Sequence, residues 1–244
     1  MGMKEEGWWE RIRFIPDTIL AIRHHNRQDG SMLPLSVGLD EAGRGCVIGP
    51  LVIAIVAAEE KDRRWFKKRN VRDSKLVPAK QREDLAWSIK DRCWHQILII
   101  SPKAIDEALY DPSRSLNELE IERMIALLRH FQEKQPVREA RILIDAMSTN
   151  AESIRKRFQA GSRQIDHHRI QAKHKADRLD RTVAAASLLA KAERERQIET
   201  IKRECGIDFG SGYCHDPRTT AFLGQCAPDC THVRWSWATA RRVS

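Results

Sequence analysis

The 244-residue sequence predicts an α/β protein with a mixed central sheet flanked by helices and followed by a helical C-terminal part. Two apolar runs, residues 37–40 and 50–58, predict neighbouring antiparallel strands, because only a short glycine-containing loop separates them. A third run at residues 141–145 contains three consecutive branched apolar residues, which is typical of a strand buried on both faces in a parallel sheet. Segments with helical spacing lie between such runs, so strands and helices alternate along the chain.

The end of the first strand carries the most specific pattern, the octet GLDEAGRG at residues 38–45. Successive strand residues point to opposite faces, so Asp40 and Glu41 can face one site only if the strand ends there. Gly43 and Gly45 can form such an end, since glycine reaches backbone conformations closed to other residues and leaves its amide uncovered. Carboxylates beside bare amides suit a divalent cation next to a phosphodiester. A hairpin with a charged turn would explain the glycines but not the two acids.

The next stretch combines basic residues with a helix start. Residues 61–69 are strongly basic and predict a loop, and residues 78–94 have the start signals and spacing of a helix. Asp73 or Ser74 can cap that helix.

The middle of the chain predicts a strand at residues 95–100, a helix at 117–131 and the buried strand that ends in Asp145. The residues that open the helix, 117–120, are predicted to be scaffold. An unpaired acid is costly to bury, and ligands collect at the carboxyl ends of strands in open α/β sheets. Asp145 is therefore the best candidate for a further metal ligand, with a strand-terminating turn as the alternative.

A more polar run at residues 165–172 predicts a last strand near an edge of the sheet. The helix expected over residues 178–204 is almost entirely small or aliphatic at 183–192, so that part must pack against the sheet. Asp177 lies just ahead of this helix, where the helix dipole favours a negative group. Asp180 carries the same carboxylate group and is an alternative to Asp177, although it equally suits the N-cap of the helix.

The C-terminal segment, residues 205–244, contains Tyr213 in a glycine-rich polar stretch that favours exposure of its ring. The six cysteines are too dispersed for a disulfide scaffold. Cys226, Cys230 and His232 could hold zinc, but no pair has the C-x-x-C spacing of common zinc sites.

The N-terminal residues 1–34 form an extension before the main domain at residues 35–204. Five apolar residues of this extension recur at helical spacing and predict an amphipathic helix interrupted near Pro16. They are Trp8, Ile12, Ile15, Ile19 and Ile22.

The formal net charge of +9 favours polyanionic partners, nucleic acid above all. No apolar run approaches the roughly 20 residues that cross a bilayer, and the N-terminus lacks a signal-peptide pattern. We therefore expect no membrane contact and a cytoplasmic location.

The hexapeptide DEAGRG at residues 40–45 resembles the opening signature of ribonuclease HII, and later stretches match that family in the same order up to about residue 237. The similarity is to the archaeal and eukaryotic branch. It implies the ribonuclease H-like fold, with residues 35–204 as the catalytic domain. It also implies four catalytic carboxylates that hold the metal: Asp40, Glu41, Asp145 and Asp177. Carboxylate oxygens select Mg²⁺ or Mn²⁺ over zinc.

The resemblance also implies the substrate and the surface that binds it. Such an enzyme hydrolyses the RNA strand of RNA–DNA hybrids and cuts on the 5′ side of ribonucleotides embedded in duplex DNA, leaving a 3′-hydroxyl and a 5′-phosphate. The residues expected to touch the substrate are Gly43, Arg44, Gly45, Lys75, Lys191 and Tyr213. A monomer is expected, and residues 241–244 show nothing like the sliding-clamp-binding peptide of the family.

Two other functions remain open from the sequence. Another nuclease of the same fold would share the four acids, but it does not predict the Gly43–Gly45 motif together with Tyr213. A non-catalytic protein that binds RNA–DNA hybrids predicts that at least one acid is replaced, whereas all four are present. Cleavage of a hybrid in magnesium and in chelator separates these possibilities.

Overall fold

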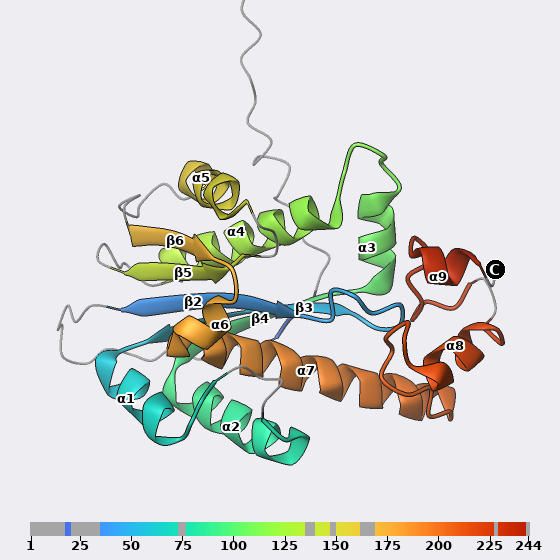
Figure 1. Ribbon diagram of the computed structural model, residues 1–244, viewed down its shortest axis with the longest axis horizontal. Helices are drawn as coiled ribbons and strands as arrows, with labels where there is room; N and C mark the ends of the chain where they lie inside the picture. The colour runs from blue at the N-terminus through green and yellow to red at the C-terminus, as the bar shows by residue number, and fades with distance from the viewer. Residues whose placement is uncertain are drawn as a thin grey trace, which may run out of the picture.

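The computed structural model describes residues 18–20, 35–72, 77–134, 140–146, 150–161, 169–226 and 229–242. Within them a six-stranded sheet with strand order β1-β4-β3-β2-β5-β6 carries helices on both faces, which confirms the α/β prediction (Figure 1). The strands are β1 (Thr18–Leu20), β2 (Ser36–Ala42), β3 (Leu51–Ala58), β4 (Trp94–Ile100), β5 (Arg141–Asp145) and β6 (Ile170–Lys173).

The sheet is mixed, as the sequence predicts. Strands β2, β3 and β4 pair antiparallel in chain order, whereas β5 lies between β2 and β6 and runs parallel to both. The three apolar residues of β5 are buried, in line with a strand covered on both faces. Strand β6 lies at the edge, and the first part of its expected range, residues 165–168, falls outside the described residues.

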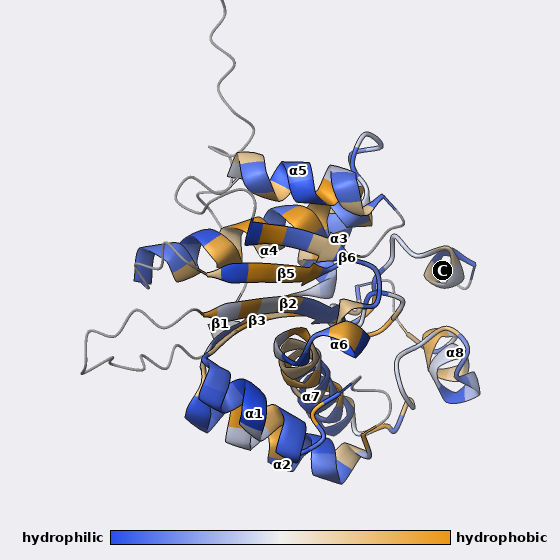
Figure 2. Ribbon diagram, turned by 60° about the vertical axis from the view of Figure 1, so that its left-hand side comes forward, coloured by the Kyte–Doolittle hydropathy of each residue, from blue (hydrophilic) through white to orange (hydrophobic). Residues whose placement is uncertain are grey.

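Helices cover both faces of the sheet and also build the C-terminal part. They are α1 (Glu60–Lys68), α2 (Ala79–Arg92), α3 (Pro102–Leu109), α4 (Leu116–Lys134), α5 (Ala151–Gly161), α6 (Ala176–Leu179), α7 (Arg181–Cys205), α8 (Pro217–Leu223) and α9 (Ala238–Arg241). Helices α1, α2 and α7 cover one face, and α3, α4 and α5 cover the other (Figure 2). Among the described residues, no helix is long and apolar enough to cross a membrane.

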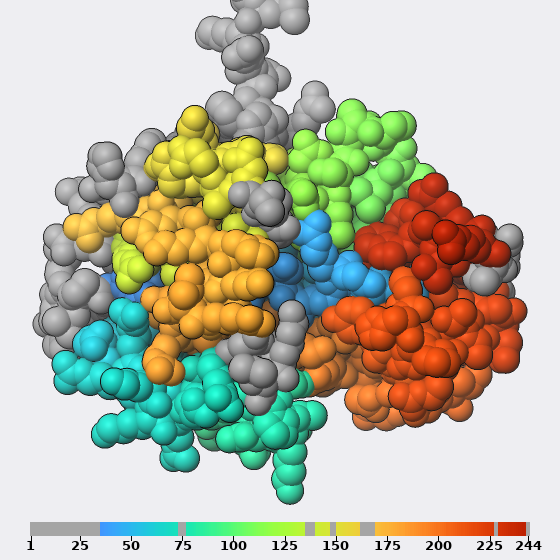
Figure 3. Space-filling view, viewed as in Figure 1, coloured from blue at the N-terminus to red at the C-terminus, as the bar shows by residue number. Residues whose placement is uncertain are grey.

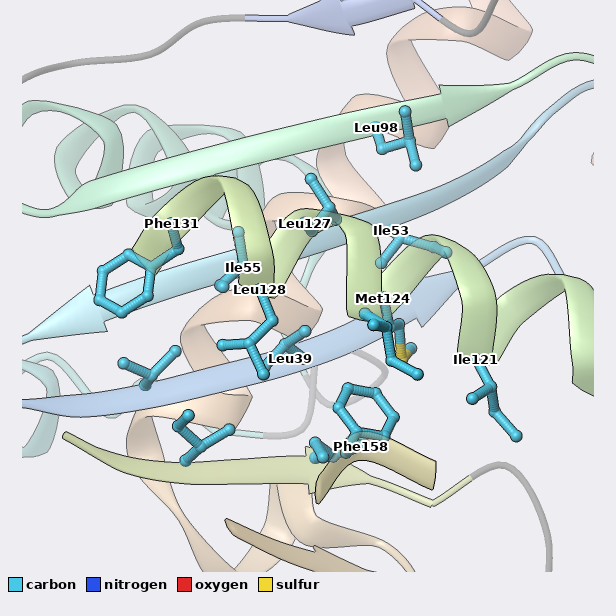
Figure 4. Packing of buried hydrophobic residues seen from close by; sticks show 14 of the residues in the cluster. Leu39, Ile53, Ile55, Leu98, Ile121, Met124, Leu127, Leu128, Phe131 and Phe158 are labelled. Carbon is cyan, nitrogen blue, oxygen red and sulfur yellow. The ribbon is translucent and has the colours of Figure 1, made fainter. Parts of the chain in front are cut away.

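Successive side chains of β3 point to opposite faces of the sheet, so this strand contributes to an apolar core on each face. Ile53 and Ile55 belong to the cluster with Met124 and Leu128 of α4, where the strand side chains meet the helix (Figure 4). The residues between them face the other way and pack on α7. A third apolar cluster joins the end of α7 to α8, α9 and the loop after β2, so the C-terminal part stands beside the sheet (Figure 3).

Two expectations about local structure are wrong. The basic stretch at residues 61–69 is helix α1 instead of a loop, because it buries Phe66 in the core and the Asp62 carboxylate accepts from the Glu59 amide at 3.2 Å. The helix expected in the N-terminal extension is contradicted at Thr18–Leu20, which pair as a strand with β4. The rest of that expected helix lies outside the described residues.

Gly38 lets α7 lie directly on β2. A methyl group at this position would stand 2.5 Å from the backbone C of Thr182 and the backbone N of Val183. We expect Gly38→Ala to lower the free energy of unfolding by about 3 kcal/mol, the upper range for overpacking, because helix backbone cannot rotate away. Chemical denaturation measures this effect. Gly224→Ala, whose nearest neighbour would be 3.6 Å away, is the control, and equal stability of the two variants would contradict the close approach.

Candidate active site

The ends of β2 and β5 bring two acids together. The parallel register places Leu39 beside Ile144, so Asp40 and Asp145 follow as neighbours at the same edge of the sheet. Asp177 joins them from α6, and the preceding amide of Ala176 donates to Asp145 Oδ1 at 2.8 Å. One carboxylate oxygen from each of these three acids lies within 4.8 Å of the others, which is spacing that suits a shared metal ion.

Asp40 and Glu41 lie on opposite faces of β2. The strand ends at Ala42, one residue after this pair and directly before Gly43, as expected from the glycines. Asp40 is opposite Ala54 on the α7 face and hydrogen-bonds Ser187 of α7. Glu41 is opposite Ile53, so its side chain leaves on the α4 face and is not part of the three-acid group. Glu41 therefore lies outside the three-acid group but close enough to Asp40 and Asp145 to interact with both.

Burial and mutual repulsion make the charged forms of these acids unfavourable. Loss of water raises the pKa of Asp40 well above its ordinary value, and the neighbouring Glu41 and Asp145 raise it further. Burial, then Asp145, raises the pKa of Glu41 to about 7, and its Oε2 atom is buried without a hydrogen-bond partner. A bound divalent cation would relieve both effects. The all-oxygen donor set and the unpaired Oε2 thus fit a hard divalent metal ion.

The glycine loop after β2 is paired with the stretch that carries Tyr213. The amides of Val47 and Ile48 both donate to the Gly212 carbonyl, at 2.9 and 3.1 Å, and Cys46 forms a bridge with Tyr213. In the space-filling view the blue segment after β2 is exposed between the orange segment of β6 and α6 and the C-terminal part (Figure 3). These contacts bring two regions predicted to bind substrate into one surface.

Two features of position 43 require glycine. Its φ of +91° is strained for other residues, and a methyl group there would lie 2.7 Å from the Pro50 carbonyl oxygen. Gly45 is exposed, and the nearest atom to a methyl group there would be Tyr213 Cε1 at 3.9 Å. The Gly45 backbone is therefore open to a ligand.

Tyr213 is half-buried rather than exposed, with its ring held by cations. The Arg194 guanidinium lies 4.7 Å from the ring centre and the Lys191 amine 5.7 Å, while His215 stacks at 5.5 Å. Arg194 is buried and donates to the Ser211 carbonyl at 2.7 Å. Arg194 is not among the residues that the sequence predicts to bind substrate, although its place one helical turn after Lys191 is a signal for such a role.

The remaining candidates lie elsewhere. Asp180 is the N-cap of α7, accepting from the Thr182 amide at 2.8 Å and pairing with Arg63 at 3.1 Å, so the capping alternative is confirmed. Lys75 lies outside the described residues. Cys226 and Cys230 pack beside the third apolar cluster. In the described parts of the chain, the three-acid group alone has metal-compatible spacing.

This fold and site define a class: an α/β protein with carboxylates gathered at the ends of parallel strands, beside open backbone amides, as in metal-dependent phosphodiester hydrolases. The family model described as ribonuclease HII matches residues 37–240. The ribonuclease HII of Archaeoglobus fulgidus is 37% identical over 206 residues, which cover 82% of this chain and 93% of that protein.

Solved structures agree with the sequence comparison. The crystal structure of ribonuclease H2 from Pyrococcus horikoshii OT3 has a TM-score of 0.75 at 35% identity, covering 86% of this chain and 96% of that one. The PCNA:RNase HII complex from Archaeoglobus fulgidus gives a TM-score of 0.70 at 36% identity, covering 86% and 95%. This chain belongs to the ribonuclease HII family and is an endoribonuclease, as the resemblance in its sequence implied.

Proposed function

We propose that this ribonuclease HII hydrolyses the RNA strand of RNA–DNA hybrids and cuts on the 5′ side of a ribonucleotide embedded in duplex DNA. The observation that carries the proposal is the three-acid group at the edge of the sheet, beside the Gly43–Gly45 loop that is hydrogen-bonded to the Tyr213 stretch. The net charge of +9 supports a polyanionic substrate. In this scheme residues 35–204 are the catalytic domain and 205–244 the substrate-reading segment.

The acids are the metal ligands in this proposal. Asp40, Asp145 and Asp177 would hold Mg²⁺ or Mn²⁺, with Glu41 reaching the site from the other face at the strand end. When bound, such an ion activates a water and stabilises the leaving 3′ oxygen. The products are then a 3′-hydroxyl and a 5′-phosphate.

The exposed loop and the tyrosine would read the sugar. A 2′-hydroxyl is the group that distinguishes RNA from DNA at a single site. Gly45 can approach it closely because no side chain intervenes, and the Tyr213 ring lies beside this glycine. Packing of that ring on the following deoxyribose would place the cut at an RNA–DNA junction. Lys75 and Lys191 would bind backbone phosphates.

Cleavage of defined duplexes tests the proposed function. Labelled RNA–DNA hybrid, duplex DNA with one ribonucleotide, all-RNA duplex and all-DNA duplex are incubated with magnesium or with chelator. We expect cuts in the first two substrates only, in magnesium only, with product ends as stated. Binding without cleavage would favour a hybrid-binding protein, and equal cleavage of the all-RNA or all-DNA duplex would favour another nuclease.

Lys191 gives a prediction about binding. Its amine lies near the Tyr213 ring and 3.7 Å from Glu195. We expect Lys191→Ala to weaken binding of every hybrid sequence and to reduce the slope of log K against log salt by about 0.9, the contribution of one phosphate contact. Fluorescence anisotropy over a salt series measures the slope. Lys103→Ala, on α3 and largely exposed, is the control. An unchanged slope for the Lys191 variant would show that this lysine does not contact a phosphate.

Two further proposals concern partners. We propose that the chain acts as a monomer, which gel filtration with light scattering would test. The Archaeoglobus fulgidus relative was solved as a complex with PCNA, so a corresponding clamp contact of this chain is a separate proposal. A pull-down with a sliding clamp would test it.

A further inference from the structure

Arg44, in the middle of the glycine loop, points its guanidinium at helix α4. Its Nη1 atom donates to Glu120 Oε2 at 2.7 Å, and its Nη2 atom donates to Asn117 Oδ1. Both partners lie one turn apart at the start of α4, so two adjacent nitrogens of the guanidinium meet two acceptors on the same helix face. This two-point arrangement fixes the direction of the side chain.

In the ion pair between Arg44 and Glu120, the difference in burial indicates that Glu120 is the fixed partner. The Glu120 side chain is completely buried, whereas 35% of the Arg44 side chain remains exposed. A buried carboxylate is costly unless a charged partner satisfies it, and removing that partner costs several kcal/mol. The neighbours of Glu120 in α4, Leu119 and Ile121, belong to the apolar core and offer no polar partner. Arg44 is therefore the hydrogen-bonded cation of a carboxyl group that α4 holds in place, and Arg234 is a second cation near that group.

A second cation, Arg234, is buried and holds the backbone of the same loop. Arg234, fully buried after α8, donates to the Gly49 carbonyl at 2.9 Å and to the Arg44 carbonyl at 3.1 Å. The side chain of Arg44 is thus tied to α4 and its carbonyl to the C-terminal part. The exposed element left between these anchors is the backbone of Gly45.

We infer that Glu120 and Asn117 are positioning residues that hold Arg44 as a tether of the glycine loop, so that the loop meets substrate through its backbone and not through the guanidinium. The inference deepens the proposed function and rests on it, because it assumes that the loop reads the substrate. It revises the sequence-based expectation in two places. Arg44, expected among the residues that touch the substrate, becomes a tether, and the start of α4, predicted to be scaffold, gains a role in the site.

A direct phosphate contact by Arg44 is the competing explanation, and the two make opposite predictions. A phosphate ligand contributes independently of Glu120 and adds about 0.9 to the salt slope of binding. A tether acts only through its partner, so removing either side chain or both should have the same effect.

A double-mutant cycle separates these explanations. Arg44→Ala, Glu120→Ala and the double variant are assayed on the hybrid and on the embedded ribonucleotide across a salt series. We expect each single variant to lose about tenfold to 100-fold in kcat/KM, as for a misplaced site, with no further loss in the double variant and an unchanged salt slope. A lower slope for Arg44→Ala, together with additive losses, would overturn the inference.

Glu120→Gln keeps the test valid if the alanine variant fails to fold, since the amide has the same shape and retains an acceptor. Glu133→Gln, an exposed residue at the other end of α4, is the matched control. Amide hydrogen exchange at residues 43–48 is followed by mass spectrometry in both variants. We expect faster exchange in Glu120→Gln only, and equal exchange in the two would contradict the tether. This measurement does not depend on activity, so it separates failure of the tether from failure of the proposed function.

Discussion

Asp145→Asn is expected to abolish cleavage while leaving the fold intact. Asp145 ends a buried strand, and one of its oxygens belongs to the three-acid group. Asparagine removes the charge that holds a cation but keeps an oxygen that can accept from the Ala176 amide, so α6 should stay in place. Loss of a metal ligand removes several kcal/mol of charge stabilisation, which corresponds to about a thousandfold loss in turnover.

Two measurements check this prediction. Single-turnover cleavage of an RNA–DNA hybrid in magnesium gives the rate, and calorimetric titration with Mn²⁺ gives metal affinity without substrate. Asp84→Asn, an exposed residue of α2, is the matched control for the loss of one carboxylate charge. Near-normal turnover and Mn²⁺ affinity in the Asp145 variant would show that this residue is not a metal ligand.

Tyr213→Ala is expected to lose activity selectively. The ring contacts Arg194 and His215 and lies next to Gly45, where it can pack on a sugar or base of the substrate. Aromatic stacking on nucleotides contributes about 1–3 kcal/mol by alanine substitution, a loss of roughly tenfold to 100-fold on the embedded ribonucleotide. A long hybrid offers many equivalent cutting positions, so the loss there should be smaller.

The selectivity is measured as the ratio of kcat/KM for the two substrates under the same conditions. Tyr213→Phe is the matched control, because it keeps the ring and its contact with Arg194, and it should retain the wild-type ratio. Equal losses of the alanine variant on both substrates, or none on the embedded ribonucleotide, would show that Tyr213 is scaffold and that the junction is read elsewhere.

The sequence alone was sufficient for features that depend on short-range patterns. The antiparallel pairing of β2 and β3 follows from two apolar runs joined by a short loop, and the burial of β5 follows from its consecutive branched residues. The position of Asp145 at the end of that strand could be predicted for the same reason. Asp145 then lies next to Asp40, because the carboxyl ends of the parallel strands β2 and β5 meet at the same edge of the sheet.

The sequence was insufficient where local pattern and packing disagree. Helix α1 contains mostly charged residues and resembles a basic loop, yet burial of Phe66 against the sheet stabilises it. Thr18–Leu20 fit a helical spacing, but they pair as β1 with the otherwise open edge of β4. In both places the deciding contacts come from elements elsewhere in the chain, and local propensity is weaker than such contacts.

The sequence by itself determined the family and the order of the main elements, and it predicted the acids, because these reside in contiguous motifs and in the periodicity of apolar residues. Only the tertiary structure decided that Asp40 and Glu41 face opposite sides of β2, and that Arg44 pairs with Glu120, 76 residues further along the chain. The physical reason is that the direction of a side chain and the partner of a buried charge depend on how separate elements pack, which no single stretch of sequence specifies.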